Sequence, residues 1–450
     1  MASTYLTRTP SSTTNRTTWT FSTWVKRSSL TNDKQSLLGS NNASSDAGYM
    51  QFRFIEGEKL NLTGYLTEYF ITNRVFRDLS AWYHIVLAVD TTQTTAGNRI
   101  KLYVNGEEET SFSTSNNPSL NQDTPINVAS SVNYIGSESY SSGTSRFFDG
   151  SMSHIHFIDG IAYDASAFGE TDATTGEWEA KTSPSVTYGT NGFFILKDGN
   201  GITDQSGEGN DFTLGGGTLT DLKDNPENVF ATFNPLASKV LGTVGFTLEN
   251  GNTVLNPSSS TAQWTTSTIC TPSTGKFYWE MKSTSSAGTD WPDIGFMFTD
   301  NISTHMALTT NPQHNFSYVS VIEANGTKWD LGTQTTSWFG GFNSNDIINC
   351  AVDVSAGKFW WGVNGSWLNS GDPVNGTNHG SNFTAGTSIT AWVSQYNVGD
   401  VQANFGNGYF GTTAITTNSG NGYAGAEGAS KFNYTVPTGY SALNTKGLNE

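Results

Sequence analysis

The chain has 450 residues, of which 13% are aromatic and 14% charged, and its formal net charge is −17. Both halves are net acidic and neither carries a basic stripe, which excludes nucleic-acid or anionic-membrane binding through clustered Lys and Arg. The longest apolar run, "IVLAV", is too short to span a membrane. Short apolar stretches between Ser, Thr, Asn and Gly predict an all-β protein, and the length predicts two tandem antiparallel β-sandwich (jelly-roll) domains.

The first half contains stretches in which apolar and polar residues alternate, as they do in half-buried antiparallel strands. Asn105 and Gly106 form the dipeptide most typical of a tight hairpin turn. Residues 166–181 are a candidate helix or irregular excursion. The strands are expected at residues 18–26, 49–55, 59–66, 82–90, 100–106, 132–138, 150–160 and 192–197.

A Gly-rich and then Asn/Pro-rich segment predicts a boundary near Leu222, which gives domains at residues 1–222 and 223–450. Cys270 and Cys350 lie in apolar stretches, which favours small buried side chains over a redox or metal role, and a disulfide between them stays open. Val436 and Tyr440 predict that the C-terminal tail packs on the second domain. Strands are expected here at residues 245–249, 275–283, 293–299, 316–323, 346–367, 388–396 and 401–407.

Two stretches of the first half, "LSAWYHIVLAVDTTQTTAGNRIKLYVNG" and "FFDGSMSHIHFIDGIA", resemble laminin-G-like domains of the concanavalin A-like fold. The second half resembles the SPRY family in "STGKFYWEMKS", "DIINCAVDVSAGKFWWGVNGSW" and "AWVSQYNVGDVQANFG". Asn345 stands where that family usually has Gly before Asp346, a departure that should alter only a turn.

This domain pair, with "DNPENVFATFNPL" between the domains and "VPTGYSALNTKGL" near the end, is similar to virion surface proteins of tailed phages, notably marine ones. The resemblance implies a tail fibre, spike or other appendage subunit, made in the host cytoplasm, released by lysis and located in the virion. A capsid decoration or head fibre is one alternative. A jelly-roll glycoside hydrolase or a cellular carbohydrate-binding adhesin is another. The implied partners are other virion proteins, further copies in a homo-oligomer, and host cell-surface polysaccharide.

Catalytic motifs are weak. Glucanases of the concanavalin A-like fold carry Glu-x-Asp-x-(x)-Glu on a strand, and the nearest match here is Glu170, Asp172 and Glu177. The gap between Asp172 and Glu177 is too long for the motif and the surrounding residues are polar, so a solvated loop is expected. His154 and His156 lie two residues apart on a strand without a close Cys or carboxylate, which favours a surface pair over a zinc site. The sequence therefore predicts no catalytic residue and no enzymatic activity.

One Gly-rich turn offers oxygen ligands for a structural Ca²⁺ ion, from Asp204, Asn210 and Asp211. An ordinary Asx turn is the favoured alternative. The laminin-G resemblance adds Asp90 and Asp149 as candidates, and no other cofactor is expected.

Nine of the thirteen Trp residues lie in the second half. Trp279, Trp360 and Trp392 stand in strands and are expected in the core. A loop-rich stretch holds further aromatic and acidic side chains, which could stack on sugar rings or fold back on their own domain. These candidate ligand-binding residues are Trp329, Asp330, Trp338 and Phe339.

Overall fold

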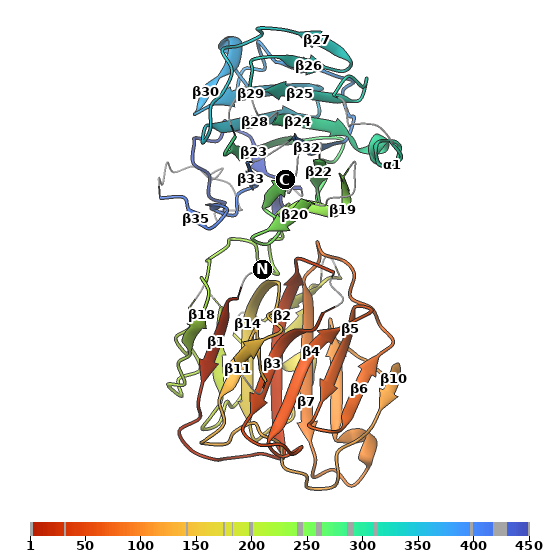
Figure 1. The fold of residues 1–450 in the computed structure, drawn as a ribbon, viewed down its shortest axis with the longest axis vertical. Helices are drawn as coiled ribbons and strands as arrows, with labels where there is room; N and C mark the ends of the chain where they lie inside the picture. The colour runs from red at the N-terminus through yellow and green to blue at the C-terminus, as the bar shows by residue number, and fades with distance from the viewer. Residues whose placement is uncertain are drawn as a thin grey trace. The chain divides into compact units, whose positions relative to one another are not determined.

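The computed structural model describes residues 3–30, 33–140, 143–173, 176–181, 183–197, 201–240, 246–257, 263–285, 292–308, 314–396, 399–416 and 430–448. The chain divides into two compact units, Met1–Asp221 (unit 1) and Leu222–Glu450 (unit 2) (Figure 1). The all-β prediction is confirmed, since the α-helices of the described part are only α1 (Ile302–Met306) and α2 (Thr445–Leu448). No helix in these ranges is long and apolar enough to cross a membrane.

Unit 1 is a sandwich of an eight-stranded and a six-stranded antiparallel sheet. In spatial order the larger sheet contains β10 (Phe112–Ser115), β6 (Glu68–Thr72), β5 (Lys59–Thr63), β4 (Tyr49–Ile55), β3 (Gln35–Asn41), β11 (Asn133–Ile135), β1 (Tyr5–Arg8) and β18 (Thr213–Gly216). The smaller contains β17 (Phe193–Ile195), β14 (Gly150–Asp159), β2 (Thr18–Arg27), β7 (Tyr83–Asp90), β8 (Ile100–Val104) and β9 (Glu107–Glu108).

Period-two alternation sets the two faces of each sheet. In β4, Met50, Phe52 and Phe54 enter the core between the sheets. Tyr49 and Arg53 therefore lie on the outer face, the face turned away from that core. The turn from β8 to β9 is at Asn105 and Gly106, whose φ angles of 48° and 85° suit the predicted tight hairpin.

A covering segment lies on the outer face of the six-stranded sheet, where Phe168 packs with Val86 and Ile158. It contains a 3-10 turn, η2 (Ala165–Ala167), and a hairpin of β15 (Gly169–Thr171) and β16 (Trp178–Ala180), in place of the candidate helix at residues 166–181. The turn and hairpin form because Asp164 caps η2 through the Ser166 N–H, and β15 then pairs antiparallel with β16.

Three histidines are buried beneath or beside this segment: His84, His154 and His156. The expectation of a surface pair at His154 and His156 is wrong, because both are buried. The His156 ring packs against Phe168 of the covering segment, and the His154 ring packs against Phe194. His84 stacks between Trp24 and Trp178, and it exchanges hydrogen bonds with Ser22 and the Trp178 indole N–H, both at 2.9 Å.

Unit 2 is also a two-sheet sandwich, antiparallel except where β36 pairs with β23, around a core that contains Trp279, Cys350 and Trp361. One sheet contains β19 (Phe233–Val240), β22 (Gln263–Ser267), β32 (Ile389–Gln395), β24 (Asp293–Phe298), β25 (Val319–Glu323), β26 (Lys328–Asp330) and β27 (Thr333–Thr335). The other contains β20 (Phe246–Glu249), β21 (Val254–Pro257), β33 (Val401–Asn404), β23 (Lys276–Ser283), β28 (Ile347–Asp353), β29 (Lys358–Val363) and β30 (Ser366–Trp367), with β31 (Ser381–Asn382) on β29 and β36 (Ser441–Ala442) on β23.

Short elements complete the fold. They are the hairpins β12 (Glu138–Tyr140) with β13 (Gly143–Ser145) and β34 (Tyr409–Phe410) with β35 (Thr413–Ala414), and the 3-10 turns η1 (Ala96–Asn98), η3 (Thr299–Asn301) and η4 (Leu368–Ser370). Cys270 and Cys350 are free thiols, so the disulfide alternative is wrong.

The C-terminal segment packs on the outer face of β23, which confirms the prediction for the tail. Val436 and Tyr440 join a cluster with Tyr278 and other aromatic side chains. The buried carboxylate of Glu280 accepts the backbone N–H groups of residues 433 and 434 at 2.9 and 2.8 Å. Burial raises the pKa of Glu280 to about 7 despite these donors.

We expect the buried histidines to make the stability of unit 1 depend on pH. Burial lowers the pKa of His84 from 6.5 to about 3, and it also lowers that of His156. The unfolded chain therefore binds protons more readily than the folded chain. The contribution of the neutral histidines to the free energy of unfolding is complete above pH 6.5 and is lost as the pH falls. Between pH 7 and pH 5 the loss at His84 should be about 2 kcal/mol.

Urea unfolding of the wild type and of His84→Gln from pH 5 to 8 measures this effect, with the exposed-histidine variant His379→Ala as the control. In the unfolding transition of unit 1, the His84→Gln protein should lose part of the pH dependence and the control none, because His379 lies in unit 2. Identical slopes for the wild type and His84→Gln would refute the effect.

Candidate functional site

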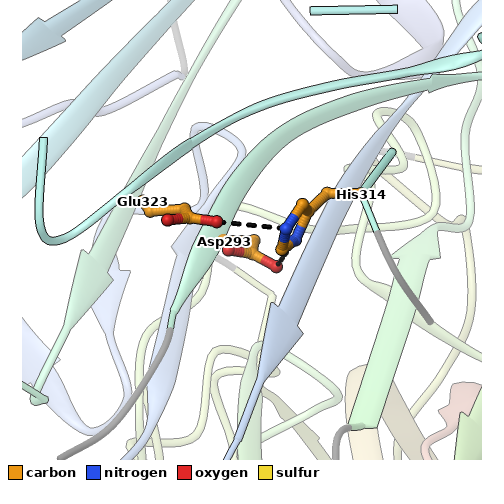
Figure 2. Close-up of side chains that lie close together, drawn as sticks. All are labelled: Asp293, His314 and Glu323. Carbon is orange, nitrogen blue, oxygen red and sulfur yellow. Dashed lines mark hydrogen bonds and ion pairs between the residues drawn. The ribbon is translucent and has the colours of Figure 1, made fainter. Parts of the chain in front are cut away.

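Asp293, His314 and Glu323 meet on the outer face of the seven-stranded sheet of unit 2 (Figure 2). Asp293 is the first residue of β24, Glu323 is the last of β25, and the two are direct cross-strand partners. Their neighbours Ile294 and Ile322 enter the core, so alternation turns both carboxylates outward. Each of the three residues offers one atom that could bind a metal ion, and these three atoms lie within 4.8 Å of one another. Among the described His, Cys, Asp and Glu side chains, this is the group with that property.

The imidazole of His314 bridges the two carboxylates. Its Nδ1 lies 3.0 Å from Asp293 Oδ2 and its Nε2 lies 3.1 Å from Glu323 Oε1. Burial alone would lower the pKa of His314, but the hydrogen bond and charge of Asp293, together with the charge of Glu323, raise it. Burial and the charge of Asp293 raise the pKa of Glu323. The cluster can therefore hold a positive charge between two acids.

Neutral donors fix the two carboxylates. Ser394 Oγ donates to Asp293 Oδ2 at 2.7 Å, and Asn325 Nδ2 donates to Glu323 Oε2 at 2.9 Å. Trp329 Nε1 donates to Glu323 Oε1 at 2.8 Å, and its ring lies against His314 with 4.6 Å between centroids. Asp293 Oδ1 is buried and has no hydrogen-bond partner among the described residues.

The four predicted ligand-binding residues do not form one surface. Trp329 and Asp330 lie in strand β26, not in a loop, so their side chains point to opposite faces. Asp330 accepts hydrogen bonds from the hydroxyls of Ser320 and Ser381. Both Trp338 and Phe339 are half-buried and pack against the core, as the fold-back alternative predicts.

The turn predicted to bind calcium is closed by its own hydrogen bonds. Asp204 accepts the backbone N–H groups of Phe194, Ser206 and Asn210 and the hydroxyl of Ser206, which accounts for its carboxylate as an Asx turn. Asp211 accepts the Asp204 N–H, and the Asn210 oxygen accepts from a guanidinium.

The other acidic candidates have local partners as well. The Asp90 carboxylate accepts hydrogen bonds from Thr18, Thr92 and Gln93. Asp149 lies near enough to Arg27 to raise the pKa of its guanidinium, although burial still lowers that pKa overall. These contacts give both residues a structural role.

The glucanase-like residues lie on the hairpin of the covering segment. Glu170 is exposed in β15, opposite Glu179 in β16, and Glu177 is exposed in the turn between the two strands. The solvated placement expected for this stretch is thus observed.

A polar network crosses the outer face of the eight-stranded sheet of unit 1. Glu138 is fully buried and accepts hydrogen bonds from Arg53 at 2.8 Å, from Tyr49 at 3.0 Å and from Arg146. Arg53 Nε also donates to the side-chain oxygen of Asn61 at 3.2 Å.

The network reaches solvent at one end, which we call the Tyr65 rim and define as Tyr65, Glu68 and Asn61. Asn61 Nδ2 donates to Glu68 Oε2 at 2.9 Å, and Glu68 is exposed. The Tyr65 ring is 46% exposed and meets the Tyr49 ring edge-on at 6.5 Å. The rim thus presents an aromatic ring and a carboxylate, and the buried amide of Asn61 holds that carboxylate in position.

Sequence reasoning did not identify Asp293, His314 and Glu323. One signal was available: "DIGFMFT" begins with an acid and "FSYVSVIE" ends with one, so pairing the two strands as a hairpin would place the acids opposite each other. His314 offers no comparable signal because it lies outside both strands.

We expect Trp338→Ala to destabilise unit 2 by about 2 kcal/mol, roughly half of what truncating a fully buried Trp costs. The Trp338 ring packs edge-on against the buried Trp361 at 6.0 Å and lies 4.8 Å from Lys328 Nζ. Chemical denaturation measures the loss, and Val374→Ala, at an exposed position of the same unit, is the control. Unchanged stability in Trp338→Ala would instead make this ring a free surface.

Comparison with known proteins supports the fold of unit 1. Residues 2–165 match the family model described as the concanavalin A-like lectin/glucanases superfamily. No curated protein sequence matches the chain significantly.

Solved structures give partial likenesses. The SPRY domain of human HERC1 is 17% identical, with a TM-score of 0.29, over 38% of this chain and 96% of that domain. The heptameric SAP-like pentraxin of Limulus polyphemus is 16% identical, with a TM-score of 0.27, over 36% of this chain and 72% of the other. Trypanosoma rangeli sialidase is 17% identical, with a TM-score of 0.25, over 34% of this chain and 22% of the sialidase. At these TM-scores the likenesses carry no argument of their own, and the family match to residues 2–165 places a concanavalin A-like jelly-roll fold in unit 1.

Proposed function

We propose that this chain is an exposed structural protein of a tailed-phage particle that binds host cell-surface polysaccharide and catalyses no reaction. The observation that carries the carbohydrate part is the Tyr65 rim, which lies on a sandwich matched by a lectin/glucanase family model. A tail fibre, spike or other appendage subunit is the favoured position, and a capsid decoration is the alternative.

The chemistry of the rim suits a sugar. The flat apolar face of a pyranose ring packs on an exposed aromatic ring, and its hydroxyls pair with amide and carboxylate groups. Tyr65 supplies the ring, and Glu68 supplies the polar group, held by the buried amide of Asn61. Arg53 holds Asn61 from beneath, so little side-chain entropy is lost when a ligand binds.

The virion part of the proposal rests on the sequence resemblance and on charge. Net charge is −17, and both halves of the chain contribute to it. Such a surface keeps a particle dispersed and opposes nonspecific binding to nucleic acid. In this role, the chain would contact other virion proteins and further copies of itself.

A glycoside hydrolase is a less suitable function for the same fold. Retaining enzymes need two rigid carboxylates about 5 Å apart, one of them with a pKa raised by burial. Glu170 and Glu177 are instead exposed on the hairpin of the covering segment. The close pair Asp293 and Glu323 is bridged by His314 and lies outside residues 2–165, which match the family model. We therefore propose that the family relationship reflects carbohydrate binding.

We expect Tyr65→Ala to weaken polysaccharide binding at least tenfold while the melting temperature stays unchanged. Glu68→Gln should weaken binding less, because an amide keeps one acceptor. Binding to β-glucans, alginates and lipopolysaccharides is measured by titration, with Leu120→Ala, at another exposed apolar position of unit 1, as the matched control. Equal binding by wild type and Tyr65→Ala would remove the rim from the proposal, and release of reducing ends would contradict the absence of catalysis.

Mass spectrometry of purified phage particles should find this chain among the virion proteins. Antibody labelling of the same particles should then place many copies at the tail. Labelling spread over the head would select the capsid alternative. Detection in infected-cell lysate but not in particles would exclude a virion role and leave the carbohydrate proposal to the binding experiment.

A further inference from the structure

The Asp293–His314–Glu323 cluster contains a like-charge pair that the fold does not balance. Asp293 and Glu323 are direct cross-strand partners on one face, and their residues are only 4% and 5% exposed. Acids in such a position lie about 5 Å apart at Cβ and repel each other, and burial removes the water that would screen them. Neutralising part of this charge, by a proton or by a cation, therefore stabilises unit 2.

The positive charges in the described surroundings are too few to neutralise both Asp293 and Glu323. Unit 2 contains no Arg in its sequence, and the nearby Lys328 is engaged with Asp330 and the Gly380 carbonyl. An imidazolium at His314 would contribute one positive charge against two negative ones. A divalent ion with a neutral imidazole would make the cluster neutral.

One carboxylate oxygen lacks a donor. Both Ser394 and His314 contact Oδ2 of Asp293, while Oδ1 is buried without a hydrogen-bond partner in the described ranges. Leaving a buried charged acceptor unpaired destabilises the folded state. The carboxyl group points toward the centre of the cluster in Figure 2. We propose that Asp293, His314 and Glu323 bind one divalent transition-metal ion of the Zn²⁺ class, independently of any carbohydrate binding by unit 1.

The ligand set selects the class of ion. An imidazole nitrogen with two carboxylate oxygens suits Zn²⁺, whereas Ca²⁺ takes six to eight oxygen ligands. Tetrahedral Zn²⁺ with bonds of about 2.1 Å places its ligand atoms about 3.4 Å apart. The 3.0 and 3.1 Å contacts start from different ring nitrogens of His314, and only one of these nitrogens can bind the ion. One ligand atom from each of the three residues lies within 4.8 Å of the others, so small side-chain rotations would bring the set to that spacing.

Binding exchanges a proton for the ion. One ring nitrogen of His314 becomes a ligand and loses its proton to solvent, and the other keeps its N–H donated to a carboxylate, which orients the ring. The His314 side chain is 24% exposed, so the ion can enter from solvent and keep a water ligand. Trp329 closes the other side through its contact with His314.

Isothermal titration of the untagged full-length chain with ZnCl₂, after chelator treatment and dialysis, tests the proposal. We expect one ion per chain with micromolar or tighter affinity, with proton release, and at least tenfold weaker binding of CaCl₂. His314→Ala should weaken Zn²⁺ binding at least tenfold. Glu323→Gln, which keeps the shape and the Trp329 acceptor, should do the same if His314→Ala is unstable.

His379→Ala is the matched control, because His379 is an exposed histidine of the same unit outside the cluster. It should bind Zn²⁺ as the wild type does. Failure of the wild type to bind, binding by His314→Ala and Glu323→Gln at wild-type affinity, or loss of the site in His379→Ala would each overturn the assignment. Equal affinity for Ca²⁺ would overturn the class of ion.

Discussion

Central strands in both units are buried on both faces, and this constraint decides where the polar side chains lie. In β2 of unit 1 every residue after Thr18 is buried, and every residue of β28 and β32 in unit 2 is buried. One face of each strand meets the apolar core, so alternation sends Ser, Thr, Asn, His and acidic residues to the outer face beneath covering chain. Because a buried polar group without a partner is costly, each must find one there. The outer faces therefore hold the networks in which recognition chemistry can develop.

Much of this arrangement follows from local sequence. The strands of the first sandwich and the turns at Asn105 and Asn364 could be predicted, because period-two alternation and Asn-Gly pairs act over a few residues. Burial of His156 could not, because it depends on Phe168 of a covering segment whose path is set by distant packing. The direction of Trp338 depends likewise on the position of Trp361.

The candidate metal cluster illustrates the same limit. Asp293 begins an apolar strand and Glu323 ends one, an ordinary pattern that predicts solvent exposure. Only the register of β24 against β25 makes them partners, and only the chain between these strands brings His314 to both. Trp329 was identified from its residue type, and the structure connects it to this cluster through Glu323.

The two units treat buried carboxylates differently, and the cause is visible in composition. All eight Arg residues lie in unit 1, where Glu138 pairs with Arg53 and Arg146, and Glu58 with Arg27. A guanidinium supplies fixed charge and several donors, so these acids are electrostatically satisfied inside the fold.

Unit 2 holds Glu280 and Glu323 mainly with neutral donors, whereas its buried Asp353 pairs with Lys276 at 3.1 Å. Glu280 relies on backbone N–H groups, a Tyr hydroxyl and an Asn amide, while Glu323 relies on Trp, Asn and His. Neutral donors orient a carboxylate but do not cancel its charge, so burial raises the pKa of both groups.

A buried carboxylate whose charge is not cancelled binds any cation that has access to it. For Glu280 that cation is a proton, because the C-terminal segment covers it completely. At Asp293 and Glu323 a partly exposed imidazole leaves a path from solvent, so the same deficit of charge can be met by a metal ion.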